Sequence, residues 1–139
     1  MNIEYLPLCQ LNARFRDTIN HATQQLLSSG CYLKGDATAQ FEKAYARYIG
    51  TQHCISCGNG FDALQLIFRA YIELGRLQPG DEVLVPANTF IASILAITEN
   101  GLTPVLIEPR MADMQIDDSL LERAITSRTR AVLLVHLYG

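Results

Sequence analysis

Residues 79–91 of this chain read PGDEVLVPANTFI. The Pro-Gly-Asp turn ends at Asp81, and the run EVLVP at 82–86, which is apolar after Glu82, predicts a short strand. A helical pattern then covers 89–100, with Gly101 as its stop. A strand that passes through a short loop into a helix is the first half of a βαβ unit, so this stretch favours an α/β fold.

The same alternation continues on both sides. Asp36 is the expected N-cap of one helix, and Ser119 and Glu122 have capping-box spacing at the start of another. Residues 1–10 are expected to form an extended arm, because Pro7 disfavours a helix. Apolar strands that alternate with helices predict a mainly parallel sheet flanked by helices. Periodicity places the other strands at 53–57, 104–108 and 130–136, and the other helices at 14–28, 37–49, 61–74 and 117–126.

The composition is that of an ordinary globular domain of 139 residues. Hydrophobic residues make up 49% of the chain, which is enough for a buried core. The net charge of −3, with no basic run, argues against a nucleic-acid-binding surface. Neither a signal-peptide pattern nor an apolar run near the ~20 residues of a membrane span is present. We therefore expect a soluble cytoplasmic protein with no nucleic-acid or membrane partner.

Two of the four cysteines form a C-x-x-C pair, Cys54 and Cys57. Such a pair is typical of zinc or redox sites, but no second pair or histidine pair accompanies it. In a strand, residues three apart point to opposite faces, which separates the two thiols. We therefore expect reduced, packed cysteines and no metal site.

Gly58-Asn59-Gly60 is a tight turn between a predicted strand and a predicted helix. A helix start offers unpaired N–H groups and a positive dipole end, which suit a phosphate, although a plain turn explains the glycines equally well. The spacing Gly58, Gly60, Ala63 also matches a dinucleotide fingerprint. That interpretation needs an acid at the carboxyl end of the next strand, where this chain has Pro86-Ala87-Asn88, so an NAD-linked oxidoreductase is disfavoured.

Three further residues lie at the expected carboxyl ends of strands, where ligands bind in parallel sheets. Phe90 is either a core residue or a stacking surface for a flat ring. Glu108 is either a site residue or a loop partner. His136 is either hydrogen-bonded structure or a functional group.

Five blocks in this order resemble the DegT/DnrJ/EryC1/StrS family of sugar aminotransferases, which depend on pyridoxal phosphate (PLP). The most specific is PGDEVLVPANTFI, which follows the family pattern P-G-D-E-V-x-V-P-x-x-T-F-x almost letter for letter. The block CGNGFDAL resembles S-N-G-T-D-A-L and points to the branch that aminates C3 of dTDP-linked keto-deoxysugars. The remaining blocks are GCYLKGDATAQFE at 30–42, QIDDSLLERAITSRTR at 115–130 and VHLYG at 135–139.

The resemblance implies a PLP-dependent transferase of fold type I and assigns roles to several residues. The main-chain amides of Gly60 and Phe61 hold the cofactor phosphate, and Phe61 stands where the family usually has threonine. Phe90 stacks on the pyridine ring, and Asn88 and Asp62 support the cofactor pocket. On the substrate side, which faces a nucleotide-linked keto sugar and an amino-acid donor such as glutamate, the resemblance places Tyr32 and Lys34.

The resemblance also implies what the 139 residues lack. The family's catalytic lysine lies beyond Gly139, and neither Lys34 nor Lys43 matches its block, so we assign no catalytic residue. We expect an arm and helix at 1–35 and the truncated N-terminal half of the large PLP-binding domain at 36–139. The expected protein is part of a homodimeric enzyme of cell-surface polysaccharide or lipopolysaccharide sugar synthesis, and it is inactive alone. The alternatives are a non-catalytic phosphate-binding or assembly fragment, and a fold type I enzyme acting on amino acids.

Overall fold

The structure, a computed structural model, describes residues 5–137 and 139. The chain forms two compact units, Met1–Ser56 and Cys57–Gly139, and each is described by itself. None of the helices in the described residues is both long and apolar enough to cross a membrane. The domain boundary expected between residues 35 and 36 stays a prediction.

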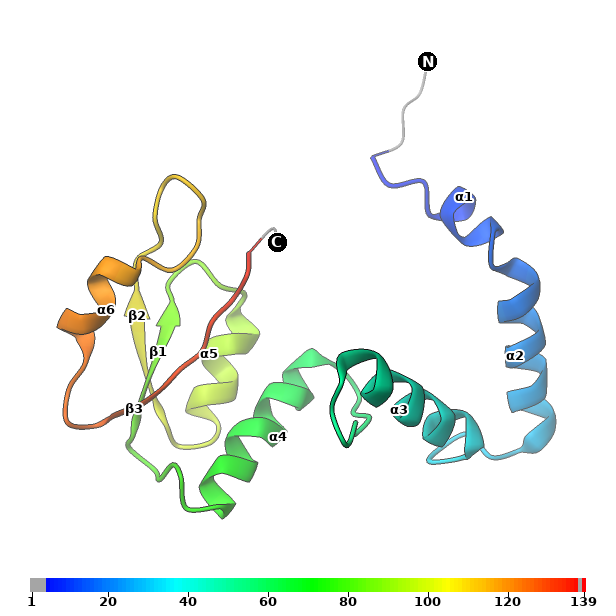
Figure 1. Cartoon of the computed structure of the whole chain (residues 1–139), viewed down its shortest axis with the longest axis horizontal. Helices are drawn as coiled ribbons and strands as arrows, with labels where there is room; N and C mark the ends of the chain where they lie inside the picture. Colours follow the sequence, from blue (N-terminus) through cyan, green and yellow to red (C-terminus); the bar gives the residue numbers. More distant parts are fainter. Residues whose placement is uncertain (1–4, 138) are drawn as a thin grey trace. The chain divides into compact units, whose positions relative to one another are not determined.

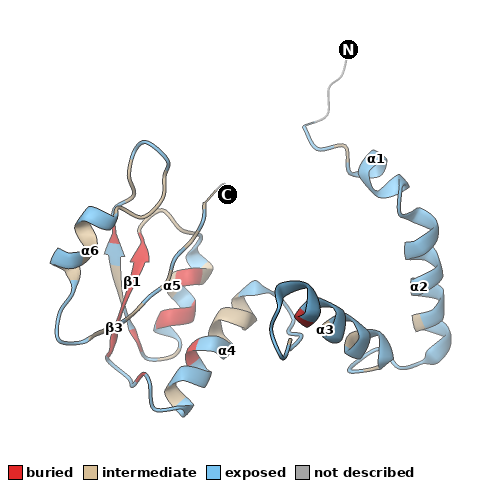
Figure 2. Cartoon of the chain, viewed as in Figure 1, coloured by how far each residue is buried: buried red, intermediate tan, exposed pale blue. Residues whose placement is uncertain are grey.

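The first unit is helical, with α1 (Leu8–Ala13), α2 (Arg16–Ser29) and α3 (Asp36–Ile49) (Figure 1). Gly30 and Gly50 end α2 and α3 in the left-handed conformation, at φ 65° and 82°. Ala46 is the one buried residue recorded in these three helices (Figure 2).

Two expectations for this unit are wrong. Residues 8–10 belong to α1 instead of an extended arm, while residues 1–4 of that arm lie outside the described residues. Pro7 occupies the N-cap position, where its missing N–H costs nothing, because no intrahelical partner exists there. The N-cap of α3 is Gly35, and Asp36 lies in the first turn of the helix. The positive end of the helix dipole stabilises its negative charge there.

The strand predicted at 53–57 does not form. The parallel sheet has three strands, and residues 53–57 are not among them. Ile55 in this segment is 80% exposed, so the apolar run finds neither a hydrogen-bonded neighbour nor a core. A strand exists only where a partner takes its N–H and C=O groups, which an apolar pattern alone cannot supply.

The second unit has the predicted α/β architecture, confirmed by a fully parallel sheet with the strand order β2-β1-β3. Two strands shift from the predicted bounds: β2 begins and ends one residue early, and β3 begins one residue early and stops well before residue 136. The Ser119–Glu122 capping box is wrong, because Asp117 is the N-cap of α6 and accepts from the Ser119 amide. The elements are α4 (Gly60–Glu73), β1 (Glu82–Pro86), α5 (Ile91–Thr98), β2 (Thr103–Ile107), α6 (Asp118–Ala124) and β3 (Thr129–Val132).

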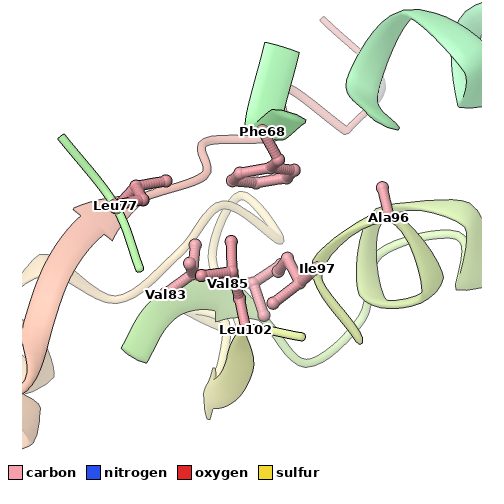
Figure 3. Close-up of a cluster of buried hydrophobic side chains, with 7 residues drawn as sticks. All are labelled: Phe68, Leu77, Val83, Val85, Ala96, Ile97 and Leu102. Atoms are coloured by element: carbon pink, nitrogen blue, oxygen red, sulfur yellow. The ribbon is translucent and has the colours of Figure 1, made fainter. Parts of the chain in front are cut away.

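The central strand β1 is buried along its whole length. Because right-handed crossovers run from β1 to β2 and then back past β1 to β3, α5 and α6 must lie on opposite faces of the sheet, as Figure 1 shows. The core between β1, α4 and α5 consists of Phe68, Leu77, Val83, Val85, Ala96, Ile97 and Leu102 (Figure 3).

A proline determines where β3 ends. The amide of Leu133 donates to the carbonyl of Leu84 at 2.8 Å, and the next ladder bond would need an N–H from Pro86, which has none. The β1–β3 ladder therefore stops at Leu133, and residues 134–137 continue past the end of the sheet without ladder bonds among the described residues.

Candidate functional site

The carboxyl edge of the sheet is the place to search for a site. The first crossover runs from β1 to β2 and the second returns from β2 past β1 to β3, and open parallel sheets of this kind bind ligands beyond the carboxyl ends of their strands. Three segments follow the strand ends there: 87–90 after β1, 108–117 after β2 and 133–137 after β3.

At the start of α4 the structure leaves two amides available. The Asn59 side chain accepts from the Asp62 amide at 3.0 Å, and the Asn59 carbonyl accepts from the Ala63 amide at 3.1 Å. Gly60 and Phe61 are the first two residues of the helix, and their N–H groups have no acceptor within the described part of the chain. They point the positive helix end at solvent, as an anion site requires.

The side chains around this turn hold it in place. The side-chain NH₂ group of Asn59 also donates to the Asp62 carboxylate at 3.1 Å. Asn59 and Asp62 therefore each donate one hydrogen bond to the other, similar to a capping box. A Cβ at Gly58 would lie 2.5 Å from that carboxylate, which explains the glycine. Phe61 packs its half-buried side chain against the core.

Phe90 lies at the N-cap position of α5 and is 76% exposed. The core interpretation of this residue is therefore wrong, and its ring is available to a ligand. Asn88, two residues earlier, is half-buried and donates its side-chain amide to the carbonyl of Met114 at 2.9 Å. It therefore braces the loop after β2.

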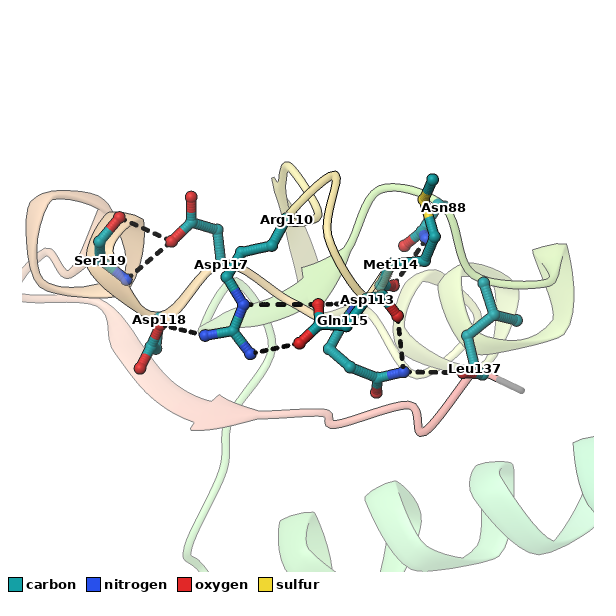
Figure 4. A network of polar contacts seen from close by, with 9 residues as sticks. All are labelled: Asn88, Arg110, Asp113, Met114, Gln115, Asp117, Asp118, Ser119 and Leu137. Atoms are coloured by element: carbon teal, nitrogen blue, oxygen red, sulfur yellow. Dashed lines mark hydrogen bonds and ion pairs between the residues drawn. The ribbon is translucent and has the colours of Figure 1, made fainter. Parts of the chain in front are cut away.

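That loop carries a polar network that sequence reasoning missed (Figure 4). Arg110 pairs with Asp113 at 2.9 Å and with Asp118 at 2.7 Å. The hydrogen bond from Arg110 lowers the pKa of Asp113, with help from the Gln115 amide, and the same bond to Asp113 raises the pKa of Arg110. The spacing of an arginine and aspartates was the only sequence signal, and it is common on protein surfaces.

The other two strand-end candidates are exposed. Glu108 uses its main-chain carbonyl to accept from the Asp117 amide at 3.1 Å. His136 lies beyond β3 and lines a cavity of about 260 Å³ together with Arg110, Gln115 and Asp118. Neither side chain forms a hydrogen bond or ion pair within the described residues.

The predicted substrate-side residues lie in the first unit, between α2 and α3. The Tyr32 hydroxyl donates to the Leu27 carbonyl at 3.4 Å, and Tyr32 is 60% exposed. Lys34 has a φ of 50°, which is uncommon for a residue other than glycine, and it lines a cavity with Cys31 and Asp36.

The cysteines depart from the expected packing. Cys9, Cys31 and Cys57 are exposed, and only Cys54 is half-buried. Because residues 53–57 are not a strand, the argument that separated Cys54 from Cys57 by strand geometry does not hold. Within residues 5–137 and 139, no three His, Cys, Asp or Glu side chains gather as a metal site.

A model of the DegT/DnrJ/EryC1/StrS aminotransferase family matches residues 14–139. The chain belongs to this family. It is 50% identical over 137 residues to dTDP-3-amino-3,6-dideoxy-alpha-D-galactopyranose transaminase from Aneurinibacillus thermoaerophilus. That match covers 99% of this chain and 37% of the relative, so the chain spans little more than a third of the relative's length.

Two solved structures show the same fold. S. venezuelae DesV, in complex with a ketimine intermediate, matches with a TM-score of 0.87 and 44% identity, over 99% of this chain and 36% of its own. E. coli GDP-4-keto-6-deoxy-D-mannose-3-dehydratase with bound hydrated PLP matches with a TM-score of 0.75 and 26% identity, over 83% and 30%. The predicted α/β fold of the PLP-dependent aminotransferases is thus confirmed.

Two features of the second unit fit the cofactor that this family implies. The amides of Gly60 and Phe61 offer two donors at a positive helix end, and a Cβ at Gly60 would meet no atom within 4 Å, so an anion has room to approach. The exposed ring of Phe90 offers an apolar face to a planar heterocycle.

Proposed function

We propose that this chain is the N-terminal, PLP-binding part of a nucleotide-sugar aminotransferase. Family membership supports the reaction class, and the names of the relatives support a nucleotide-linked sugar as substrate. The observation in the molecule that carries the proposal is the pair of unengaged amides at Gly60 and Phe61.

In this proposal each end of the cofactor has its own partner. The amides of Gly60 and Phe61 bind the phosphate, helped by the dipole of α4. The ring of Phe90 stacks on the pyridine, which contributes about 1 kcal/mol beyond area burial. When bound, PLP supplies an electron sink through which an amino group passes from donor to keto sugar.

Other residues hold these groups or face the substrate. Asp62 fixes the start of α4 through Asn59, and Asn88 fixes the loop after β2 through Met114. Tyr32 and Lys34 are proposed to contact the nucleotide sugar, as polar groups of an exposed loop in the first unit.

The finer assignments rest on family resemblance. We propose glutamate as the amino donor, a dTDP-linked keto-deoxysugar as acceptor, and cell-surface polysaccharide or lipopolysaccharide synthesis as the context. We also propose a cytoplasmic homodimer in which residues 36–139 form half of the large domain.

Residues 1–139 alone are proposed to be inactive. Their only lysines are Lys34 and Lys43, and both lie in the first unit, on the 30–35 loop and in α3. Covalent attachment and proton transfer need one amine positioned against the bound cofactor. Neither lysine matches the lysine block of the family that the chain resembles.

The proposal is tested by NMR titration of the ¹⁵N- and ¹³C-labelled chain with pyridoxamine 5′-phosphate. This probe has no aldehyde, so it does not react with Lys34 or Lys43. We expect the amide signals of Gly60 and Phe61 to shift, together with the ring signals of Phe90.

Pyridoxamine without phosphate and inorganic phosphate are the matched controls. If phosphate alone shifts the two amides as strongly and Phe90 does not respond, the chain is a phosphate-binding fragment, which is the alternative function. If neither ligand perturbs Gly60 and Phe61, the cofactor assignment is wrong.

A further inference from the structure

The segment that follows β3 is held by a side chain instead of by the sheet. Pro86 has no N–H, so the β1–β3 ladder ends at Leu133. Residues 134–137 nevertheless continue along the carboxyl edge, where the cofactor is proposed to bind.

Gln115 forms the side-chain contact that holds this segment. Its side-chain amide donates to the carbonyl of Leu137 at 2.7 Å and to the carbonyl of Asp113 at 3.3 Å (Figure 4). The bond to Leu137 joins residues 22 positions apart and is partly buried. His136 therefore lies between two fixed points, the ladder bond at Leu133 and the Gln115 bond at Leu137.

Met114, the residue before Gln115, contacts the segment that follows β1. The Met114 carbonyl accepts from the Asn88 side chain at 2.9 Å, and Asn88 follows the end of β1. Adjacent residues of one loop thus connect to two strand ends: Met114 to the end of β1 and Gln115 to the continuation of β3.

Further contacts define the shape of this loop. Met114 has a φ of 59°, a conformation that turns its carbonyl toward Asn88 at a cost in backbone energy. The Asp113 carboxylate accepts from the Gln115 amide at 3.0 Å and is itself held by Arg110. The main-chain amide of Arg110 donates to the Gln115 carbonyl and the amide of Met114 donates to the Arg110 carbonyl, each at 2.8 Å, and these bonds close the loop.

We propose that Met114 and Gln115 form a clamp that fixes the segment after β3 relative to the end of β1. In this clamp Gln115 is a positioning residue: it sets the place of residues 134–137, His136 included, at the cofactor edge. The proposal deepens the proposed function and rests on it for the identity of the ligand. The clamp takes the place of the β1–β3 ladder bond for which Pro86 has no N–H group.

The experiment compares the full chain with Gln115→Met, which keeps the side-chain length and removes the donor. Gln115→Glu is the second variant, since it keeps the shape but presents a carboxylate to the Leu137 carbonyl. Gln78→Met is the matched control, because Gln78 is exposed on a loop of the same unit and its side chain makes no hydrogen bond within the described residues. The readouts are ¹⁵N order parameters and the dissociation constant of pyridoxamine 5′-phosphate.

We expect the order parameters of residues 134–137 to fall from about 0.85 to below about 0.6 in both Gln115 variants, while Leu84 and Val85 keep theirs. The dissociation constant should rise by up to about fivefold, because ordering the released segment again on binding costs at most the one net hydrogen bond that held it. Gln78→Met should change neither readout.

Unchanged order at 134–137 in a folded variant overturns the clamp, and so does a loss of order spread evenly over the sheet. If the unmodified chain does not bind the probe, the proposed function fails. The order parameters still decide on the clamp in that case, because they require no ligand.

Discussion

The carboxylate of Glu82, at the amino end of β1, accepts a hydrogen bond of 2.6 Å from the hydroxyl of Thr126, in the turn before β3. The Thr129 hydroxyl donates to the same oxygen at 3.2 Å, and Arg128 forms an ion pair with the carboxylate at 2.6 Å. This cluster ties the amino ends of two neighbouring strands together. The bond from Thr126 is the main reason that the pKa of Glu82 lies below its ordinary value, and the charge of Arg128 also lowers it while burial opposes the shift.

Replacing Glu82 with glutamine should remove a pH-dependent part of the stability. Because the pKa is lowered in the folded state, the ionised carboxylate stabilises the fold above the ordinary value of 4.5, and this stabilisation is lost as the pH falls through the folded-state pKa. We expect Glu82→Gln to be less stable than the parent at pH 7, with the difference shrinking toward pH 3. Urea unfolding at pH 7, 4 and 3 measures it.

The control for this prediction is Glu73→Gln, which neutralises an exposed carboxylate paired with Arg69 on α4. Its effect on the free energy of unfolding should be small throughout. A difference between parent and Glu82→Gln that is the same at pH 7 and pH 3 would contradict the assignment of the lowered pKa.

Alanine variants of Phe68 and Phe90 should distinguish a residue that stabilises the fold from one that binds the cofactor. Phe68 is 5% exposed within the core, so Phe68→Ala should lower the free energy of unfolding by about 3–5 kcal/mol. Phe90 is 76% exposed, so Phe90→Ala should change it by no more than about 0.5 kcal/mol and should weaken pyridoxamine 5′-phosphate binding. Urea unfolding and the NMR titration test this pair. A large stability loss in Phe90→Ala would indicate that its ring is a packing residue after all.

The two glycines of the α4 turn should respond in opposite ways to alanine. A Cβ at Gly58 lies 2.5 Å from the Asp62 carboxylate, so Gly58→Ala should displace Asp62 and cost about 0.5–1.5 kcal/mol as the bond to Asn59 is lost. A Cβ at Gly60 meets nothing within 4 Å, so Gly60→Ala should stabilise by about 0.4–1 kcal/mol through a stiffer unfolded chain. Thermal unfolding ranks the variants, and equal destabilisation by both would refute the described turn.

Met114 and Met111, in the same loop, provide a matched test of backbone strain. Met114 has a φ of 59°, whereas Met111 is 82% exposed and is not among the residues with positive φ. A left-handed conformation costs a non-glycine residue about 1–2 kcal/mol, so Met114→Gly should be more stable than Met111→Gly by about that amount. Chemical unfolding of both variants gives the difference, and a value near zero would mean that Met114 carries no strain.

Much of the second unit follows from local pattern. The run VLVP that follows Glu82 is apolar throughout, and it forms most of the fully buried central strand because a strand covered on both faces needs no polar side. Asn59 and Asp62 cap α4 through bonds that span three residues, so the tight turn at 58–60 contains the information for its own geometry.

The sequence did not predict which distant segments pair or form hydrogen bonds with one another. Residues 53–57 have the composition of a strand but no strand beside them, and the predicted strand at 130–136 stops early because Pro86 on the neighbouring strand lacks a donor. The hydrogen bonds of Gln115 to Leu137 and of Asn88 to Met114 join residues 22 and 26 positions apart. A pattern of nearby residues in the sequence does not predict such bonds.

The sequence by itself determined the α/β class, the family and the helix start that offers amides at Gly60 and Phe61, because each depends on short-range patterns of apolar, glycine and capping residues. Only the tertiary structure decided that Phe90 is exposed, that β3 ends at Val132 and that one loop joins two strand ends. Those features depend on which backbone groups and surfaces meet in space, and hydrogen bonds and burial are properties of pairs that the linear order of residues does not specify.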